Sequence, residues 1–147
     1  MNSQKLINKS VSLLDVSTIE YVKGVEYQKS LFDEIISIKS KNRKNQTSVA
    51  TKNYFIFCEH NHVYTLGKNG NNKNFLADIE TQKKIGASFH LTNRGGDITY
   101  HGPEQIVGYP IIDLENFFTD LGKYMRGIEE VIIETLNEFS IKAERSA

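Results

Sequence analysis

Three neighbouring side chains in the stretch Asn93–Asp113 could do chemistry, because Thr99, Tyr100 and His101 place a hydroxyl, a phenol and an imidazole in a row. In an extended strand, Thr99 and His101 share one face and Tyr100 takes the other. Gly102-Pro103 then turns the chain sharply. The segment therefore predicts a polar pocket rim beside an apolar strand, which suits a substrate with an apolar tail and a reactive polar end.

An arginine and two glycines precede those side chains. Gly95 and Gly96 remove two side chains in a row, so a ligand can approach the backbone, or the chain can take a φ that other residues avoid. Arg94 can clamp an anion, or it can order the loop by donating hydrogen bonds to carbonyl groups. His101 alone fits either a catalytic group or a structural histidine. A turn-rich hairpin, in which glycine and proline serve geometry alone, is the alternative to a binding site.

Other residues in the chain could also do chemistry. His60 and His62 lie two positions apart and could chelate a metal, but no further Cys/His cluster lies near them in the sequence, and we predict no metal site. Cys58 could be a nucleophile, yet it ends the apolar run Tyr54–Cys58, where a cysteine is expected to pack as a small buried side chain. Arg94–Asp97 does not fit the G-x-G-x-x-G phosphate fingerprint, so no dinucleotide cofactor is predicted.

Length, charge and cysteine usage bound the class of protein. The chain has 147 residues, which suits a single domain spanning 1–147. Lys+Arg and Asp+Glu both count 18, so the charge favours neither nucleic acid nor a membrane as a partner. One cysteine excludes a disulfide within the chain and favours a reducing compartment. Since no apolar run has signal-peptide or membrane-spanning length, we predict a soluble, cytoplasmic protein.

The apolar pattern predicts the elements that position these side chains. Short apolar runs predict strands at Ser10–Ser17, Tyr54–Cys58, Val63–Leu66, Ser88–Asn93 and Gln105–Asp113, the last interrupted or at a sheet edge because of Pro110. Helical spacing predicts helices at Ile19–Lys41 (capped by Ser17 or Thr18), at Phe75–Gly86 and, after a Thr119 N-cap, over roughly five turns. The segment Lys39–Asn53 contains five Lys or Arg residues and no Asp or Glu, which predicts a mobile loop or a docking site for an acidic protein partner. The order of elements predicts an α+β domain with helices packed on a mixed β-sheet.

The sequence RGGDITYHGPEQIVGYPIIDL, Arg94–Leu114, resembles the signature of the lipoyl(octanoyl) transferases, which are octanoyl-[acyl-carrier protein]:protein transferases. EHNHVYTLGKNG, Glu59–Gly70, is similar to the segment that precedes it in that family, and the resemblance runs from about Tyr21 onward. It implies a fold similar to the biotin and lipoate protein ligases, with a mixed sheet flanked by helices. It also implies transfer of an octanoyl group from octanoyl-acyl carrier protein to a lysine of a lipoyl domain, the first step of protein lipoylation.

The resemblance further implies the site and its partners. The residues that match the family's acyl-binding stretch are Arg94, Gly95, Gly96, Asp97, Ile98, Thr99, Tyr100 and His101. The implied acceptors are the lipoyl domains of 2-oxoacid dehydrogenases and the glycine cleavage H protein. The family's nucleophilic cysteine and its helper lysine lie in a segment beyond the match, so the resemblance assigns no catalytic residue here and implies a C-terminally incomplete chain.

Two alternatives and one departure accompany this interpretation. The chain could be a non-catalytic acyl-binding remnant that lacks the nucleophile, or a relative of the lipoate and biotin ligases, which activate their acid with ATP. Glu104 stands where the family usually has glycine, in HGPEQ, so a charged side chain lies beside the predicted pocket turn.

Overall fold

The computed structural model describes residues 7–146. Its chain divides into two compact units, one that ends at Asp113 and one that begins at Leu114. The candidate site lies wholly in the first unit. The single domain over 1–147 stays a prediction.

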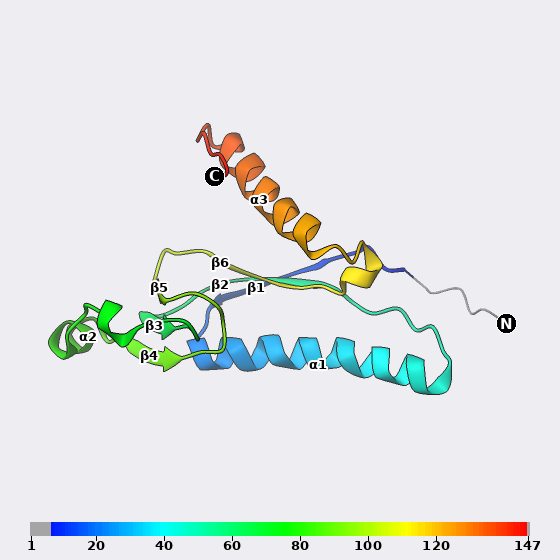
Figure 1. Ribbon diagram of the computed structural model, residues 1–147, viewed down its shortest axis with the longest axis horizontal. Coiled ribbons are helices and arrows are strands. Elements are labelled where there is room, and N and C mark those ends of the chain that lie inside the picture. The colour runs from blue at the N-terminus through cyan, green and yellow to red at the C-terminus, as the bar shows by residue number, and fades with distance from the viewer. Residues whose placement is uncertain (1–6, 147) are drawn as a thin grey trace. The chain divides into compact units, whose positions relative to one another are not determined.

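The first unit contains a mixed three-stranded sheet of order β1-β2-β6 (Figure 1), built from β1 (Ser12–Thr18), β2 (Tyr54–Glu59) and β6 (Val107–Ile111). β1 runs parallel to β2 and β6 runs antiparallel to it. β6 is thus an edge strand, which confirms the expectation from Pro110, because proline is tolerated where one side of the strand needs no ladder hydrogen bond.

The long helix α1 (Tyr21–Asn45) runs along this sheet (Figure 1). Alternate residues of β2 are buried, and Ile35 is the large apolar side chain that α1 buries. Polar contacts join the same surfaces, because the Tyr54 hydroxyl donates to Glu34 Oε2 at 2.8 Å and Lys39 Nζ lies 2.8 Å from Asp113 Oδ1. Helix and sheet therefore pack against each other around Ile35.

Both ends of α1 differ from the prediction. The N-cap is Glu20, whose carboxylate accepts from the backbone N–H groups of Val22 and Lys23, whereas Ser17 sits in a left-handed bulge at φ 51°. The helix continues to Asn45, beyond the predicted end at Lys41, because its backbone hydrogen bonds extend past the last apolar residues of the pattern. The following segment is not a mobile loop throughout, since Thr51 and Asn53 are 5% and 1% exposed and are anchored by side-chain hydrogen bonds.

A second mixed sheet of order β4-β3-β5 carries the residues of the predicted site. It consists of β3 (Val63–Leu66), β4 (Ser88–Leu91) and β5 (Ile98–His101), with β4 parallel and β5 antiparallel to β3. Between β3 and β4 come the 3₁₀ turn η1 (Asn72–Asn74) and the helix α2 (Ile79–Ile85). α2 begins later than predicted because Asp78 caps it, and it ends as expected at Gly86, at φ 65°. The α+β class with mixed pairing is confirmed, with the strands divided between two sheets.

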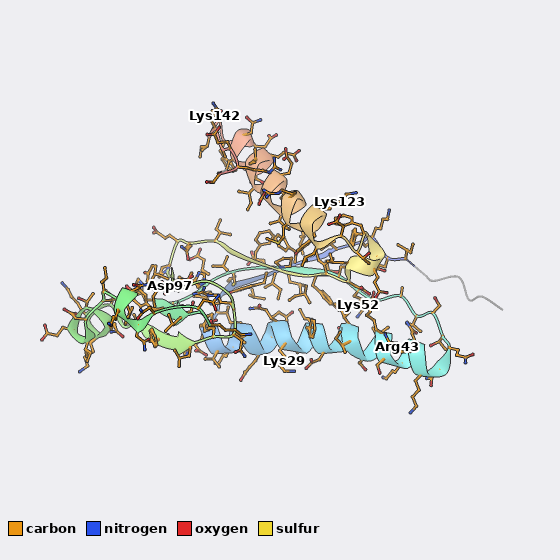
Figure 2. The ribbon with its side chains drawn as sticks, viewed as in Figure 1. Lys29, Arg43, Lys52, Asp97, Lys123 and Lys142 are labelled. Carbon is orange, nitrogen blue, oxygen red and sulfur yellow. The ribbon has the colours of Figure 1, made fainter. Side chains whose placement is uncertain are left out.

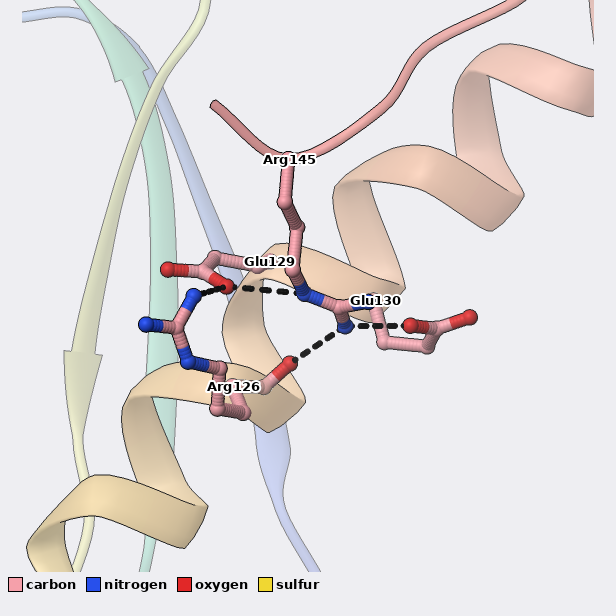
Figure 3. A network of polar contacts seen from close by, with 4 residues as sticks. All are labelled: Arg126, Glu129, Glu130 and Arg145. Atoms are coloured by element: carbon pink, nitrogen blue, oxygen red, sulfur yellow. Dashed lines mark hydrogen bonds and ion pairs between the residues drawn. The ribbon is translucent and has the colours of Figure 1, made fainter. Parts of the chain in front are cut away.

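The second unit consists of the 3₁₀ turn η2 (Leu114–Asn116) and the helix α3 (Leu121–Glu138), followed by a segment that turns back along the helix. α3 has 18 residues, which confirms the predicted five turns, but its cap is Asp120 and not Thr119. Arg145 in the returning segment donates to the carboxylates of Glu129 and Glu130, and Arg126 also pairs with Glu129 (Figure 3). No residue of α3 is buried.

Candidate functional site

Two loops meet at the C-terminal end of β3, and their backbones are in close contact. The N–H of Gly67 donates to the Asp97 carbonyl at 3.2 Å, and the N–H of Lys68 donates to the Arg94 carbonyl at 2.9 Å. A Cβ on Gly67 would lie 2.4 Å from the carbonyl oxygen of Gly96, closer than a real Cβ ever comes. Only glycine at position 67 therefore allows the loop 94–97 to fold onto β3.

Arg94 orders this loop from within. Its Nη2 donates to the carbonyls of Thr65 and Asp97 at 2.8 and 2.7 Å, its Nη1 donates to the Gly95 carbonyl, and its Nε reaches the Thr65 hydroxyl. Four of the five N–H donors of the guanidinium group are thus used inside the protein. Of the two roles that the sequence allowed, loop ordering is the one observed.

The two glycines after Arg94 differ in what surrounds them. Gly96 has φ 81°, a left-handed conformation that favours glycine. Gly95 has no such φ, and a Cβ built on it would meet nothing within 4 Å. The backbone at Gly95 therefore borders open space, whereas Gly96 is needed for the turn itself.

Asp97 fastens η1 to the loop. Its carboxylate accepts from the backbone N–H of Asn71 at 3.1 Å and from the side-chain amide of Asn74. These hydrogen bonds, the one from Asn74 first, hold the pKa of the Asp97 carboxyl below its usual value. Asp97 lies at the opposite end of α1 from Arg43 (Figure 2), and 25 helical residues span about 37 Å. The basic Lys39–Asn53 segment is therefore not part of this site.

The predicted alternation along β5 is present. His101 lies opposite Val63 and Thr99 lies opposite Thr65, so these side chains share one face of the sheet. Tyr100 takes the other face, where it stacks on His62 with Nδ1 and the hydroxyl 2.5 Å apart, and it also contacts Tyr64. Ile98 pairs with Leu66 and lies on the same face of the sheet as Tyr100. The stretch 94–101 is thus divided: Thr99 and His101 share a face, whereas Ile98 and Tyr100 do not point to it.

His101 has one nitrogen engaged. Its Nδ1 lies 3.0 Å from Gln105 Oε1, which as a carbonyl oxygen can only accept, so Nδ1 carries a proton. Within residues 7–146, Nε2 has no hydrogen-bond partner. Burial lowers the pKa of His101, and the nearby His60 and Arg94 lower it further against the opposite effect of Gln105. At neutral pH, His101 therefore presents an unprotonated Nε2.

His60, which the sequence analysis considered as one of two possible metal ligands, is buried and packs against His101. His60 is 0% exposed, with Nδ1 2.8 Å from the Ile19 carbonyl and Nε2 2.8 Å from the Tyr109 hydroxyl. Because a carbonyl only accepts, Nδ1 carries a proton, and Nε2 is left to pair with the Tyr109 hydroxyl. The rings of His60 and His101 meet edge to face with centroids 5.8 Å apart. His62 faces Tyr100 instead, so the two histidines are not brought together around a metal.

The sequence analysis missed four further residues of this cluster: Tyr21, Gln28, His90 and Tyr109. Tyr21 lies between His60 and His90, with ring centroids 5.5 and 5.3 Å away. Burial raises the pKa of Tyr21 and strongly raises that of Tyr109, which also receives a hydrogen bond from Gln28. Helical spacing alone marked none of them. Among the residues that the structure describes, no group of three or more His, Cys, Asp or Glu could hold a metal ion.

Comparison with known proteins decides the family. Residues 25–147 match the model of the lipoyl protein ligase A/B catalytic domain. The chain belongs to this family. The family assignment confirms the resemblance drawn from Arg94–Leu114.

Curated relatives in this family carry the name octanoyltransferase. The proteins of Christiangramia forsetii and Flavobacterium johnsoniae are each 51% identical to this chain over 140 residues, which is 95% of this chain and 60% of the relative. The protein of Cytophaga hutchinsonii is 50% identical over 143 residues, which is 96% of this chain and 59% of the relative. The chain thus spans about 60% of the length of the curated relatives that it matches.

Cys58, the one cysteine of this family member, is placed as a packing residue. Its side chain is 5% exposed, and burial raises the pKa of its thiol. Its sulfur lies 3.7 Å from His60 Nε2, but that nitrogen already accepts from Tyr109. A buried thiol with a raised pKa is a poor nucleophile, in agreement with the structural role predicted for it.

Glu104, in the turn after His101, adopts a backbone conformation that favours glycine. Its φ is 67°, in the left-handed region, where a Cβ crowds the backbone. Its N–H donates to Glu59 Oε2 at 2.8 Å, which holds the turn after His101 against the end of β2. The departure from the family pattern therefore places strain in the turn.

Of the helices that the structure describes, none has the length and apolar character to cross a membrane.

Proposed function

We propose that this chain takes part in octanoyl transfer, moving an octanoyl group from octanoyl-acyl carrier protein to a lysine of a lipoyl domain. The acceptors would be the lipoyl domains of 2-oxoacid dehydrogenases and the glycine cleavage H protein. Kinship with octanoyltransferases over 95% of the chain supports this reaction. Cys58 is not assigned a catalytic role, because its thiol is buried.

The residues proposed to hold the acyl group are Arg94 to His101, with the roles that their contacts support. The observation that carries the proposal is the open space at Gly95, where an added Cβ would meet nothing within 4 Å. Arg94 holds the loop in the shape that exposes this backbone. An acyl chain can therefore lie against the backbone at Gly95, with its polar end toward Thr99 and His101.

Titration of the ¹⁵N-labelled chain with octanoyl-acyl carrier protein tests the proposal. We expect amide shifts at Gly95, Gly96, Thr99 and His101, and none of this size with carrier protein that bears no acyl group. Gly95→Ala should weaken binding about tenfold or more without loss of stability, because the new methyl group fits the free protein but occupies the acyl space. Gly127→Ala is the matched control, since its Cβ also meets nothing within 4 Å and it lies in α3.

Equal binding by the Gly95→Ala and Gly127→Ala variants would contradict the acyl site. Intact-mass measurement after incubation with octanoyl-acyl carrier protein adds a second test. We expect no adduct on Cys58, and an octanoyl group found there would overturn the assignment of that thiol to packing.

A further inference from the structure

The free nitrogen of His101 belongs to the same cluster of side chains as the hydroxyls of Thr99 and Tyr21. Nδ1 of His101 donates a hydrogen bond to Gln105 Oε1, which leaves Nε2 as an acceptor. Among the described residues, the hydroxyls of Thr99 and Tyr21 also have no hydrogen-bond partner. The position of these groups follows from the shared face of Thr99 and His101 and from the ring contacts that link Tyr21 to His60 and His60 to His101.

Burial is the main reason why Nε2 of His101 is an acceptor and not a donor at neutral pH. The neighbouring His60, which follows β2, and the charge of Arg94, from the loop before β5, also disfavour a proton on the ring. Tyr21 at the start of α1 has a raised pKa and stays neutral, and Val63, opposite on β3, carries no charge. No acid is among the groups that shift the pKa of His101, so nothing in that set stabilises a charged ring.

A neutral acceptor of this kind fits a substrate group that carries N–H. The proposed reaction brings such a group to the acyl carbon, because the acceptor lysine attacks through its amine. We propose that His101 Nε2 accepts a hydrogen bond from the nitrogen of that lysine and takes the proton which the nitrogen releases as the amide forms. This inference rests on the proposed function and names a catalytic residue within it.

The step balances without a further reactant. The amine nitrogen attacks the carbonyl carbon of the octanoyl thioester, so a C–N bond forms and the C–S bond breaks with its electron pair on sulfur. The proton moves from nitrogen to His101 Nε2 and forms a transient imidazolium ion, because Nδ1 already carries a proton. Since burial and the charge of Arg94 disfavour the charged ring, the ring readily releases this proton to the departing thiolate. The products are the octanoyl amide and a free thiol, and His101 returns to its starting state.

His60 is the positioning residue for this arrangement. Its own tautomer is fixed by Ile19 on one side and Tyr109 on the other, so its ring cannot rotate without breaking a buried hydrogen bond. Because its ring packs edge to face with the ring of His101, it confines the direction in which Nε2 of His101 points. Glycine at position 24 makes room for this ring, since a Cβ there would lie 3.1 Å from His60 Cε1.

A pair of ligands that differ in one atom tests the inference on this chain. The first is Nε-octanoyl-lysine, blocked at both backbone ends, whose amide supplies the N–H. The second is the matched ester, in which oxygen replaces that N–H. By calorimetry at pH 7.5, we expect the chain to bind the amide about three- to tenfold more tightly than the ester, the worth of one net hydrogen bond.

Two variants separate the hydrogen bond from the fold. His101→Asn keeps a donor near the position of Nδ1 for Gln105 but removes Nε2, and should abolish the preference for the amide. His101→Gln places an amide oxygen near the position of Nε2, and should retain part of it. In the wild-type chain the preference should also disappear as the pH falls through the pKa of His101, because a protonated Nε2 cannot accept.

Each outcome has a definite meaning. Equal affinity for amide and ester, or a preference that His101→Asn or low pH leaves unchanged, overturns the role of His101 and leaves the acyl site standing. Failure of both ligands to bind the wild-type chain removes the acyl site and this inference with it. A preference that follows Nε2 through both variants and the pH series supports the proposal.

Discussion

Glu104 carries a backbone conformation that its side chain does not favour. A left-handed φ of 67° destabilises a residue with a Cβ by roughly 1–2 kcal/mol, and glycine removes this strain. Glycine also stabilises the unfolded chain through its greater conformational freedom, which offsets part of the gain. We therefore expect Glu104→Gly to raise the free energy of unfolding by about 0.5–1 kcal/mol. Urea denaturation measures this, with Glu104→Ala, which keeps the Cβ, as the control. A loss of stability in Glu104→Gly would show that the glutamate side chain is needed.

His101 links stability to pH at the same scale. Its pKa is lowered in the folded protein, so the unfolded chain takes up the proton first as the pH falls through the ordinary value of about 6.5. The contribution of this residue is therefore complete above that value and decreases down to the lowered pKa. We expect the free energy of unfolding to fall less between pH 7.5 and 5 in His101→Asn than in the wild type. Equal slopes would contradict the lowered pKa.

At the scale of elements, the junction of α1 with the end of the first sheet depends on one buried carboxylate. Asp113 is 6% exposed and accepts from Lys39 Nζ and from the Thr51 hydroxyl, each at 2.8 Å. Asp113→Ala removes a buried carboxylate that accepts from both of these partners, and should lower the free energy of unfolding by about 2–3 kcal/mol. Asp33→Ala is the control, because its ion pair with Lys29 is exposed and should change stability by no more than about 0.5 kcal/mol. Similar losses in both variants would argue against the junction.

α3 offers a gain in stability at an exposed position. Gly127 lies inside the helix, and an added Cβ meets nothing within 4 Å. Gly127→Ala should therefore stabilise α3 by up to about 1 kcal/mol, the difference in helix propensity. Hydrogen exchange of the α3 amides measures this locally, and faster exchange in the variant would contradict it.

What the sequence could predict at these two scales follows the range of the interactions. Tyr54–Cys58, Val63–Leu66 and the five turns of α3 depend on local periodicity and were found. The Glu20 cap was missed because Ser17 and Thr18 are the more usual cap residues.

In the site, the alternation of Thr99 and His101 follows from the pleat of a strand and was found. The contacts of His60 with Ile19 and Tyr109 join residues 41 and 49 positions away, and no local pattern encodes them. The choice between the two roles of Arg94 also required the loop geometry.

At the scale of the whole molecule, large apolar side chains are exposed in both units. Leu13, Leu76 and Ile106 are 71%, 90% and 76% exposed in the first, and Leu121 and Phe139 are 63% and 73% exposed in the second. Exposed apolar surface of this kind favours association. We expect the chain to bind an apolar fluorescent dye in native buffer and to associate as its concentration rises, as measured by light scattering. A monomer that binds no dye at high concentration would contradict this.

The burial of Cys58 makes the labelling rate of its thiol a measure of how often the protein opens. It is the one cysteine of the chain, and its 5% exposure means that a bulky thiol reagent reaches it only when β2 opens. The labelling rate of the unmodified protein therefore reports how often the central strand of the first sheet opens, and its dependence on reagent concentration separates rare opening from slow chemistry. An octanoyl ligand that stabilises the closed state should slow this labelling, so the labelling rate of Cys58 also reports occupancy of the site.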